Sequence, residues 1–160
     1  MLEIRIIEKN DNPQIASIIK EVLTEYGADP KTTMLGDPKV NYMYEQYLEP
    51  NSIYFVAILD GELVGGCGIK QLMANDSTIC ELQRMYLLKK ARGLKIGKKL
   101  IDLSLEKAKK FNFSKIYLET ISNMAAAQTL YKKYGFKEIN NYLGDTGHSG
   151  CDVKMLLEIA

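Results

Sequence analysis

Residues of the kinds that form metal sites and disulfide frameworks are scarce in this sequence of 160 residues. It has one histidine, His148, and three cysteines, Cys67, Cys80 and Cys151. The cysteines are odd in number and widely spaced, and no CxxC pair occurs, so we expect reduced thiols rather than disulfides. A single histidine also argues against a metal site.

Long apolar runs and a large net charge are missing as well. No apolar run is long enough to cross a bilayer, and Met1–Arg5 lacks the basic-then-apolar form of a secretory signal, so we expect a cytoplasmic protein without a membrane partner. The 21 basic and 20 acidic residues nearly cancel, which argues against a general binder of nucleic acid. The length suits one domain, which we expect over 1–160.

The first third of the chain predicts one strand and two helices. Apolar and charged residues alternate over 2–6, which is typical of a strand with one buried face. Apolar residues then recur at helical spacing over 15–26, and Gly27 is placed to end that helix. A loop over 28–36 precedes a second predicted helix over 40–48.

The rest of the chain predicts a hairpin followed by alternating helices and strands. These elements are, in order, strands over 53–59 and 63–69 joined at Asp60-Gly61, a strand over 78–88, a helix over 97–111, a strand over 115–120, a helix over 125–134 closed by Gly135, and strands over 136–139 and 153–159. The antiparallel hairpins exclude a doubly wound parallel sheet, whereas the later β-α-β-α units require parallel pairing. The sequence therefore predicts an α/β fold with a mixed (α+β) sheet and helices on both faces.

The stretch Arg84–Leu100 predicts an anion site. It reads as a strand that enters a lysine-rich turn with Gly93 and Gly97 and then opens into an amphipathic helix. The first turn of a helix leaves backbone N–H groups without partners and carries partial positive charge, and glycines let a ligand approach the backbone closely. A phosphate or pyrophosphate suits such a place.

Charge distribution favours the same interpretation. From Arg84 to Lys115 the chain has eleven basic residues against two acidic ones. A localised basic patch on a near-neutral protein suits a small, highly charged ligand better than a long nucleic acid. The alternative, a solvated lysine-rich helix face, accounts for the lysines at 107, 109 and 110 but not for the glycines at the helix entrance.

Over essentially its whole length, the chain resembles the GCN5-related N-acetyltransferase (GNAT) superfamily, which transfers an acetyl group from acetyl-coenzyme A to an amine. Three segments carry the resemblance: Glu81–Leu87 is similar to the family's fourth strand, Arg92–Gly97 to its pyrophosphate loop, and Ala126–Phe136 to its late helix with a tyrosine and a Gly-Phe pair. The resemblance implies a GNAT-like acyl-CoA N-acyltransferase fold.

Two positions depart from the family pattern. Lys95 stands where the pyrophosphate loop has its central glycine, so Gly93 is expected to supply conformational freedom and Lys95 an added charge toward phosphate. The spacing from Asn123 to Tyr131 is one residue longer than the common form.

The resemblance implies a set of site residues and acetyl-coenzyme A as co-substrate, with no metal. Glu81 is the expected base, acting through water, and Tyr131 is the expected acid that protonates the leaving thiolate. A backbone N–H near Tyr86 or Leu87 is the expected oxyanion donor. The residues expected to bind the cofactor are Met85, Tyr86, Leu87, Arg92, Gly93, Leu94, Lys95, Ile96, Gly97, Lys98, Asn123 and Ala126.

Each catalytic assignment has a structural alternative. Glu81 is flanked by Cys80 and Leu82 in an apolar strand, which favours a raised pKa, although an edge-facing charge without a role fits the same pattern. Tyr131 shares a helical face with other apolar residues, so it equally fits core packing.

The sequence leaves alternatives open for the acetyl acceptor and for the activity. Tyr42, Tyr44 and Tyr47 fit either an acceptor cleft or a packed aromatic face, and the acidic remainder of the chain favours a cationic amine of a small molecule or peptide. The resemblance allows a homodimer. Two rival hypotheses are a Cys151 nucleophile with His148 as base, and a coenzyme A-binding regulatory module with weak or no catalysis. The loop lacks the P-loop pattern, which excludes a nucleotide triphosphatase.

Overall fold

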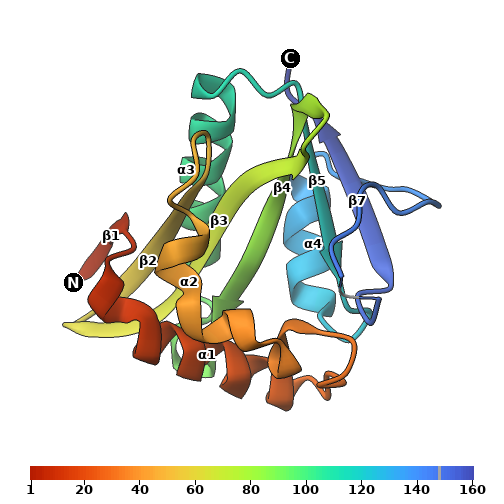
Figure 1. Ribbon diagram of the computed structural model, residues 1–160. Helices are drawn as coiled ribbons and strands as arrows, with labels where there is room; N and C mark the ends of the chain where they lie inside the picture. The colour runs from red at the N-terminus through yellow and green to blue at the C-terminus, as the bar shows by residue number, and fades with distance from the viewer. Residues whose placement is uncertain (148) are drawn as a thin grey trace.

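A single mixed sheet organises the computed structural model, which describes residues 1–147 and 149–160 (Figure 1). Within these residues seven strands lie in the order β1-β2-β3-β4-β5-β7-β6. Every neighbouring pair is antiparallel except β4 and β5, which are parallel. The strands are β1 (Leu2–Ile6), β2 (Ile53–Leu59), β3 (Glu62–Met73), β4 (Asp76–Leu87), β5 (Lys115–Thr120), β6 (Lys137–Glu138) and β7 (Val153–Glu158).

Helices cover both faces of the sheet, as the sequence predicts. They are α1 (Asn12–Glu25), α2 (Met43–Gln46), α3 (Ile96–Lys110) and α4 (Ala125–Lys133). The pair α1 and α2 lies on one face, and α3 and α4 lie on the other (Figure 1). Each face has its own apolar cluster, because successive strand side chains point to opposite sides. In the described part of the chain, no helix has the length and apolar character to cross a membrane.

The prediction of one continuous helix over 40–48 is wrong. The structure has a 3₁₀ turn over Pro38–Tyr42 and only then the short α2, because Tyr42 leaves the helical region at φ −127° and ψ 43°. The side chain of Asn12 accepts a 2.8 Å hydrogen bond from the backbone N–H of Tyr44. A contact from the start of α1 therefore sets the orientation of α2, and local periodicity does not report it.

The β3–β4 hairpin is longer than predicted and holds the irregularities that shape the centre of the molecule. Its pairing extends to Met73 and Asp76, beyond the predicted end of β3 at 69. The register shifts between Gly66 and Gly68, where Arg84 on β4 has a left-handed φ of 54°. This is a β-bulge, which bends the strand and changes the direction of the side chains that follow.

The parallel pairing of β4 and β5 is short. It joins only Ile79–Glu81 to Lys115–Tyr117, after which the two strands diverge (Figure 1). Beyond Glu81, β4 has no partner strand on its β5 side among the described residues. The divergence opens the sheet where the lysine-rich turn follows β4.

Candidate active site

A cleft of about 940 Å³ lies where β4 ends and α3 begins. Its walls come from the end of β4, the turn after it, the first two turns of α3, the inner side of α1 and one side of α4 along its length. The lining residues are Val22, Tyr26, Met85, Tyr86, Leu87, Ala91, Arg92, Gly93, Lys95, Ile96, Gly97, Lys98, Lys99, Asp102, Met124, Ala126, Ala127, Leu130, Lys133 and Tyr134. The predicted anion site is thus one wall of a larger cleft.

The entrance to α3 has the backbone geometry of an anion site. Lys95 is the N-cap residue and has a left-handed φ of 65°, and no side chain caps the helix. The first N–H groups of α3, beginning at Ile96, are therefore left for a ligand. Gly93 is also left-handed, at φ 76°. The expectation that Gly93 takes over the conformational freedom is incomplete, because Lys95 itself adopts the conformation that glycine favours.

Basic side chains surround that entrance. Lys95, Lys99 and Lys133 line the cleft and form no ion pair within the described residues. Lys98 pairs with Asp102 at 3.1 Å, and Asp102 also accepts a hydrogen bond from Tyr134. The cleft thus combines several cations with one carboxylate that is already engaged.

Arg92 lines the cleft but is held by other groups. Its Nη1 and Nη2 atoms donate to the two carboxylate oxygens of Glu25 at 2.6 and 2.8 Å, and the guanidinium lies 5.2 Å from the ring of Tyr26. It also donates to the carbonyl of Leu87. Arg92 therefore ties the turn after β4 to α1, and this fixes the width of the cleft.

Most residues predicted to bind the cofactor line this cleft, and two do not. Leu94 is 52% exposed and turns away from the lining. The side chain of Asn123 donates a 3.0 Å hydrogen bond to the carbonyl of Tyr26, so it closes a contact between α1 and α4. Sequence reasoning missed Val22 of α1 and Tyr26, which directly follows that helix, because their periodicity indicates only core packing.

Glu81 is a buried carboxylate at the point where β4 and β5 separate. It is 8% exposed, and burial raises its pKa to about 7, with a further increase from the charge of Glu119. The side-chain amide of Gln83 donates a 2.6 Å hydrogen bond to Glu81, which lowers the pKa by favouring the charged form. A carboxylate with these properties can accept a proton near neutral pH.

A second side chain extends this hydrogen-bond chain. The hydroxyl of Tyr47 donates to the side-chain oxygen of Gln83 at 2.7 Å, which fixes the amide so that its nitrogen faces Glu81. The rings of Tyr47 and Tyr54 lie against β3 where Gly66 and Gly68 leave room, since a Cβ at either glycine would meet a tyrosine ring within 3.0 Å. The glycines of β3 therefore permit the approach of Tyr47.

Tyr131 lies on α4, on the face of the sheet opposite Tyr47. It is 5% exposed and packs edge-on against Phe136 with ring centroids 5.9 Å apart. Burial raises the pKa of its phenol, so the hydroxyl keeps its proton. That hydroxyl forms no hydrogen bond with another described residue. Every fully buried polar side-chain atom of the described residues does have a hydrogen-bond partner, so the Tyr131 hydroxyl is not fully buried and reaches accessible space. Its neighbours Ala127 and Leu130 line the cleft.

The geometry argues against the rival thiol hypothesis. Burial raises the pKa of the Cys151 thiol to about 12, whereas a nucleophilic cysteine needs the thiolate. Its proposed base, His148, lies outside the described residues. Cys67 and Cys80 are fully buried, and burial raises the pKa of each to about 12. Among the described residues, no group of three or more His, Cys, Asp or Glu side chains could hold a metal ion.

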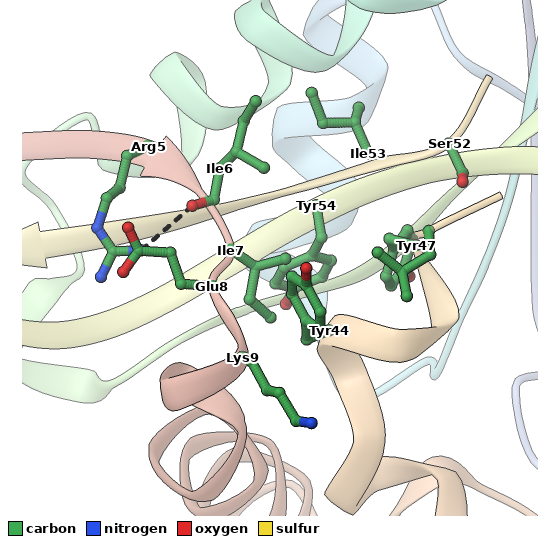
Figure 2. Close-up of a pocket in the computed structure, with 11 residues that line it drawn as sticks. Arg5, Ile6, Ile7, Glu8, Lys9, Tyr44, Tyr47, Ser52, Ile53 and Tyr54 are labelled. Carbon is green, nitrogen blue, oxygen red and sulfur yellow. Dashed lines mark hydrogen bonds and ion pairs between the residues drawn. The ribbon is translucent and has the colours of Figure 1, made fainter. Parts of the chain in front are cut away.

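A second cavity, of about 660 Å³, lies between the end of β1, α2 and the start of β2 (Figure 2). Tyr44 and Tyr47 line it, and Tyr42 is 60% exposed outside it. The hydroxyl of Tyr47 is directed to Gln83 on β4. Of the tyrosines considered for an acceptor cleft, only Tyr47 therefore contacts the residues around Glu81.

Comparisons with known proteins agree with this architecture. The family model described as "Acetyltransferase (GNAT) family" matches residues 17–136. The chain is 42% identical over 157 residues to the Escherichia coli K12 protein named uncharacterized N-acetyltransferase YjgM, covering 97% of this chain and 93% of that one.

Solved structures give the same result. An acetyltransferase of the GNAT family from Staphylococcus aureus has a TM-score of 0.85 at 25% identity and covers 99% of both chains. The structure of yncA from Salmonella typhimurium with its cofactor acetyl-CoA has a TM-score of 0.77 at 18% identity, covering 99% of this chain and 94% of that one. This second likeness concerns the fold alone.

Proposed function

The chain belongs to the GNAT family of acetyl-CoA-dependent acetyltransferases, and on this premise we propose that a primary amine of a small molecule or peptide attacks the acetyl group directly, with Glu81 as base and Tyr131 as acid. The observation that carries the proposal is Glu81 itself, a buried carboxylate with a pKa of about 7 where β4 and β5 diverge. We propose that residues 1–160 act as one domain.

The residues of the cleft fit coenzyme A. Uncapped N–H groups at the start of α3 and the lysines beside them suit its pyrophosphate, and the rest of the 940 Å³ leaves room for the arm that carries the thiol. Met85 to Leu87 line the cleft at the edge of β4 that faces the divergence. Bound acetyl-coenzyme A supplies a thioester whose carbonyl carbon forms the new bond to nitrogen while its bond to sulfur breaks.

The chain's own residues move the protons. An ammonium group gives up one proton to become a nucleophile, and Glu81 accepts it through water and returns it to solvent. A second proton leaves the nitrogen once the C–N bond has formed. Tyr131 donates a proton to the sulfur as the C–S bond breaks, and the second amine proton restores the phenol. One proton is released in each turnover.

The phenol of Tyr131 suits the role of donor for two reasons. Burial raises its pKa, so it is protonated at any pH at which the enzyme works. Its hydroxyl is not committed to another group of the described chain, whereas the hydroxyl of Tyr134 on the same helical segment already bonds Asp102 and the carbonyl of Lys98.

The test is release of free thiol from acetyl-coenzyme A in the presence of a panel of primary amines. We expect turnover with at least one amine, and a loss of about 100-fold or more in kcat/KM for Glu81→Gln with coenzyme A affinity unchanged. Tyr131→Phe should lower kcat more than it weakens coenzyme A binding. Tyr42→Phe, at an exposed position, is the matched control.

Two outcomes contradict the proposal. Binding of coenzyme A without turnover of any amine would favour the regulatory-module alternative. Full activity in both Glu81→Gln and Tyr131→Phe would remove the acid and base assignments while leaving the family membership intact.

A further inference from the structure

Several charged side chains meet on the α1–α2 side of β4 and β5, and we call them the acceptor-side cluster: Glu81, Arg84 and Glu119. The parallel register places Glu81 beside Tyr117, and Glu119 follows two residues later on the same face of β5. The charge of Glu119 raises the pKa of Glu81 and the charge of Arg84 lowers it, so both act on the same carboxylate.

Arg84 reaches this face because of the bulge in β4. Its backbone is left-handed, at φ 54°, a conformation that a non-glycine residue keeps only where its surroundings require it. The carbonyl of Arg84 accepts a 2.8 Å hydrogen bond from the hydroxyl of Tyr54, which holds the bulge in place. The half-buried side chain then lies against α2, with its guanidinium 5.9 Å from the ring of Tyr47.

The Arg84 guanidinium is engaged only by neutral groups of the described chain. Its Nη1 atom donates to the side-chain oxygen of Gln46 at 2.6 Å and to the sulfur of Met43 at 3.4 Å. No carboxylate in the described part of the chain pairs with Arg84, and the one further side chain in hydrogen-bonding contact with its guanidinium is that of Tyr47. The Nε and Nη2 atoms of a guanidinium present two parallel N–H donors, the geometry that binds a carboxylate bidentately.

Neither carboxylate of the cluster has a cation within ion-pair distance among the described residues. Glu119 accepts hydrogen bonds from the hydroxyls of Tyr117 at 2.5 Å and Thr146 at 2.7 Å, and Glu81 accepts one from Gln83. Neither forms an ion pair with a described residue. A buried charge such as that of Glu81 is costly without a counter-charge in contact, so a ligand that supplies a cation beside it and an anion for Arg84 would be favoured here.

We propose that the acetyl acceptor is an amine that also carries a carboxylate, of the amino-acid class. Its carboxylate binds the Nε–Nη2 edge of Arg84, and its ammonium group faces Glu81 and Glu119. This rests on the proposed function, in which Glu81 receives the proton of that ammonium group. Arg84 is then the specificity-determining residue, and the bulge in β4 directs it toward the acceptor.

The test compares kcat/KM for matched acceptors: amino acids, their carboxamides, and the amines left by removal of the carboxylate. We expect the wild-type enzyme to favour the carboxylate form at least tenfold. Arg84→Gln should abolish that preference, and Arg84→Lys, which keeps the charge but loses the planar edge, should reduce it. Lys70→Gln is the control, because Lys70 is a neighbouring cation already paired with Glu49, and it should keep the preference.

The outcomes separate the two proposals. Acetylation of carboxamides, polyamines or peptides as fast as or faster than amino acids would overturn the acceptor class and leave the proposed function standing. The assignment of Arg84 as the residue that binds the acceptor carboxylate is overturned if Arg84→Gln, checked for folding by coenzyme A affinity and thermal unfolding, keeps the full preference. Absence of acetylation with every amine, despite coenzyme A binding, would overturn the proposed function and the acceptor class together.

Discussion

The side-chain amide of Gln83 donates a 2.6 Å hydrogen bond to the carboxylate of Glu81, two residues before it on β4. Burial and the charge of Glu119 raise the pKa of that carboxylate, and the bond from Gln83 opposes them. Tyr47 holds the amide in the orientation that allows the bond. A contact between the sheet and the segment that follows α2 therefore limits how far burial raises the pKa of Glu81.

The first prediction concerns the pH dependence of activity. Because the base must be deprotonated, kcat/KM should rise with pH and level off, with a midpoint near the Glu81 pKa of about 7. Gln83→Met removes a hydrogen bond that favours the charged form, so the midpoint should move to higher pH. The measurement is kcat/KM against pH. Gln71→Met on β3, whose side chain bonds the carbonyl of Met73, should leave the midpoint in place. A downward shift in Gln83→Met would contradict the argument.

The second prediction concerns stability. Glu81 binds its proton more tightly in the folded chain, at a pKa of about 7, than at its ordinary value of 4.5. The stability contributed by this proton is complete below pH 4.5 and is lost as pH rises to about 7, because between these values the unfolded chain gives up the proton while the folded chain still holds it. The side-chain amide in Glu81→Gln does not ionise, so the stability of this variant does not fall with pH in this way.

The advantage of Glu81→Gln over the wild type should therefore grow across that pH range, by an amount on the order of 3 kcal/mol. Urea unfolding at several pH values from about 4 to about 8 measures it. Glu62→Gln, at a 60% exposed carboxylate, is the control and should show no comparable change. Parallel curves for wild type and Glu81→Gln would exclude a raised pKa for Glu81.

The elements with long regular periodicity could be predicted from the sequence because their cause is local. The apolar spacing that predicts α1 depends on residues of α1 alone, and Gly27 ends it with a left-handed φ of 72°. The helix over 40–48 failed for the opposite reason, because Asn12, far away in the chain, bonds the backbone of Tyr44. Patterns within a segment cannot report such a partner.

The candidate site likewise has one part that could be predicted from the sequence and another that could not. The anion-binding turn follows from glycines, lysines and a helix start that are adjacent in sequence. The orientation of Arg84 depends on a bulge set by the register between β3 and β4, and on α2 lying over that strand. The side chain of Asn123 likewise has a distant partner, because it donates a hydrogen bond to the carbonyl of Tyr26 at the end of α1. These are relations between segments, and only the assembled fold defines them.

The third prediction concerns Lys95. Its φ of 65° is strained for a residue with a Cβ, so Lys95→Gly should be more stable than Lys95→Ala by about 1 kcal/mol. Both substitutions remove a cation from the cleft, and both should weaken coenzyme A binding by a similar factor that shrinks at high salt. Thermal unfolding and titration with coenzyme A measure the two effects. Equal stability of the two variants would show that the conformation carries no strain.

The fourth prediction concerns the room beside Gly97. A Cβ there would lie 3.2 Å from the Cε of Met85 and 3.4 Å from a Cδ of Leu130, both at the ends of flexible side chains. Gly97→Ala should therefore fold normally and lose less than about fivefold in coenzyme A affinity, since those ends can move. Gly97→Leu would place branched atoms in the cleft beside the uncapped N–H groups, and we expect affinity to fall by more than about tenfold.

Titration of each Gly97 variant with coenzyme A, followed by thermal unfolding, separates a blocked cleft from a damaged fold. Lys109→Leu adds the same side chain at an exposed position of α3 and should bind coenzyme A as the wild type does. If Gly97→Leu keeps wild-type affinity, the first turn of α3 does not contact the cofactor, and the pyrophosphate must lie elsewhere in the cleft. If Gly97→Ala already abolishes binding while remaining folded, the ligand approaches the backbone at this position more closely than the side-chain contacts around Gly97 require.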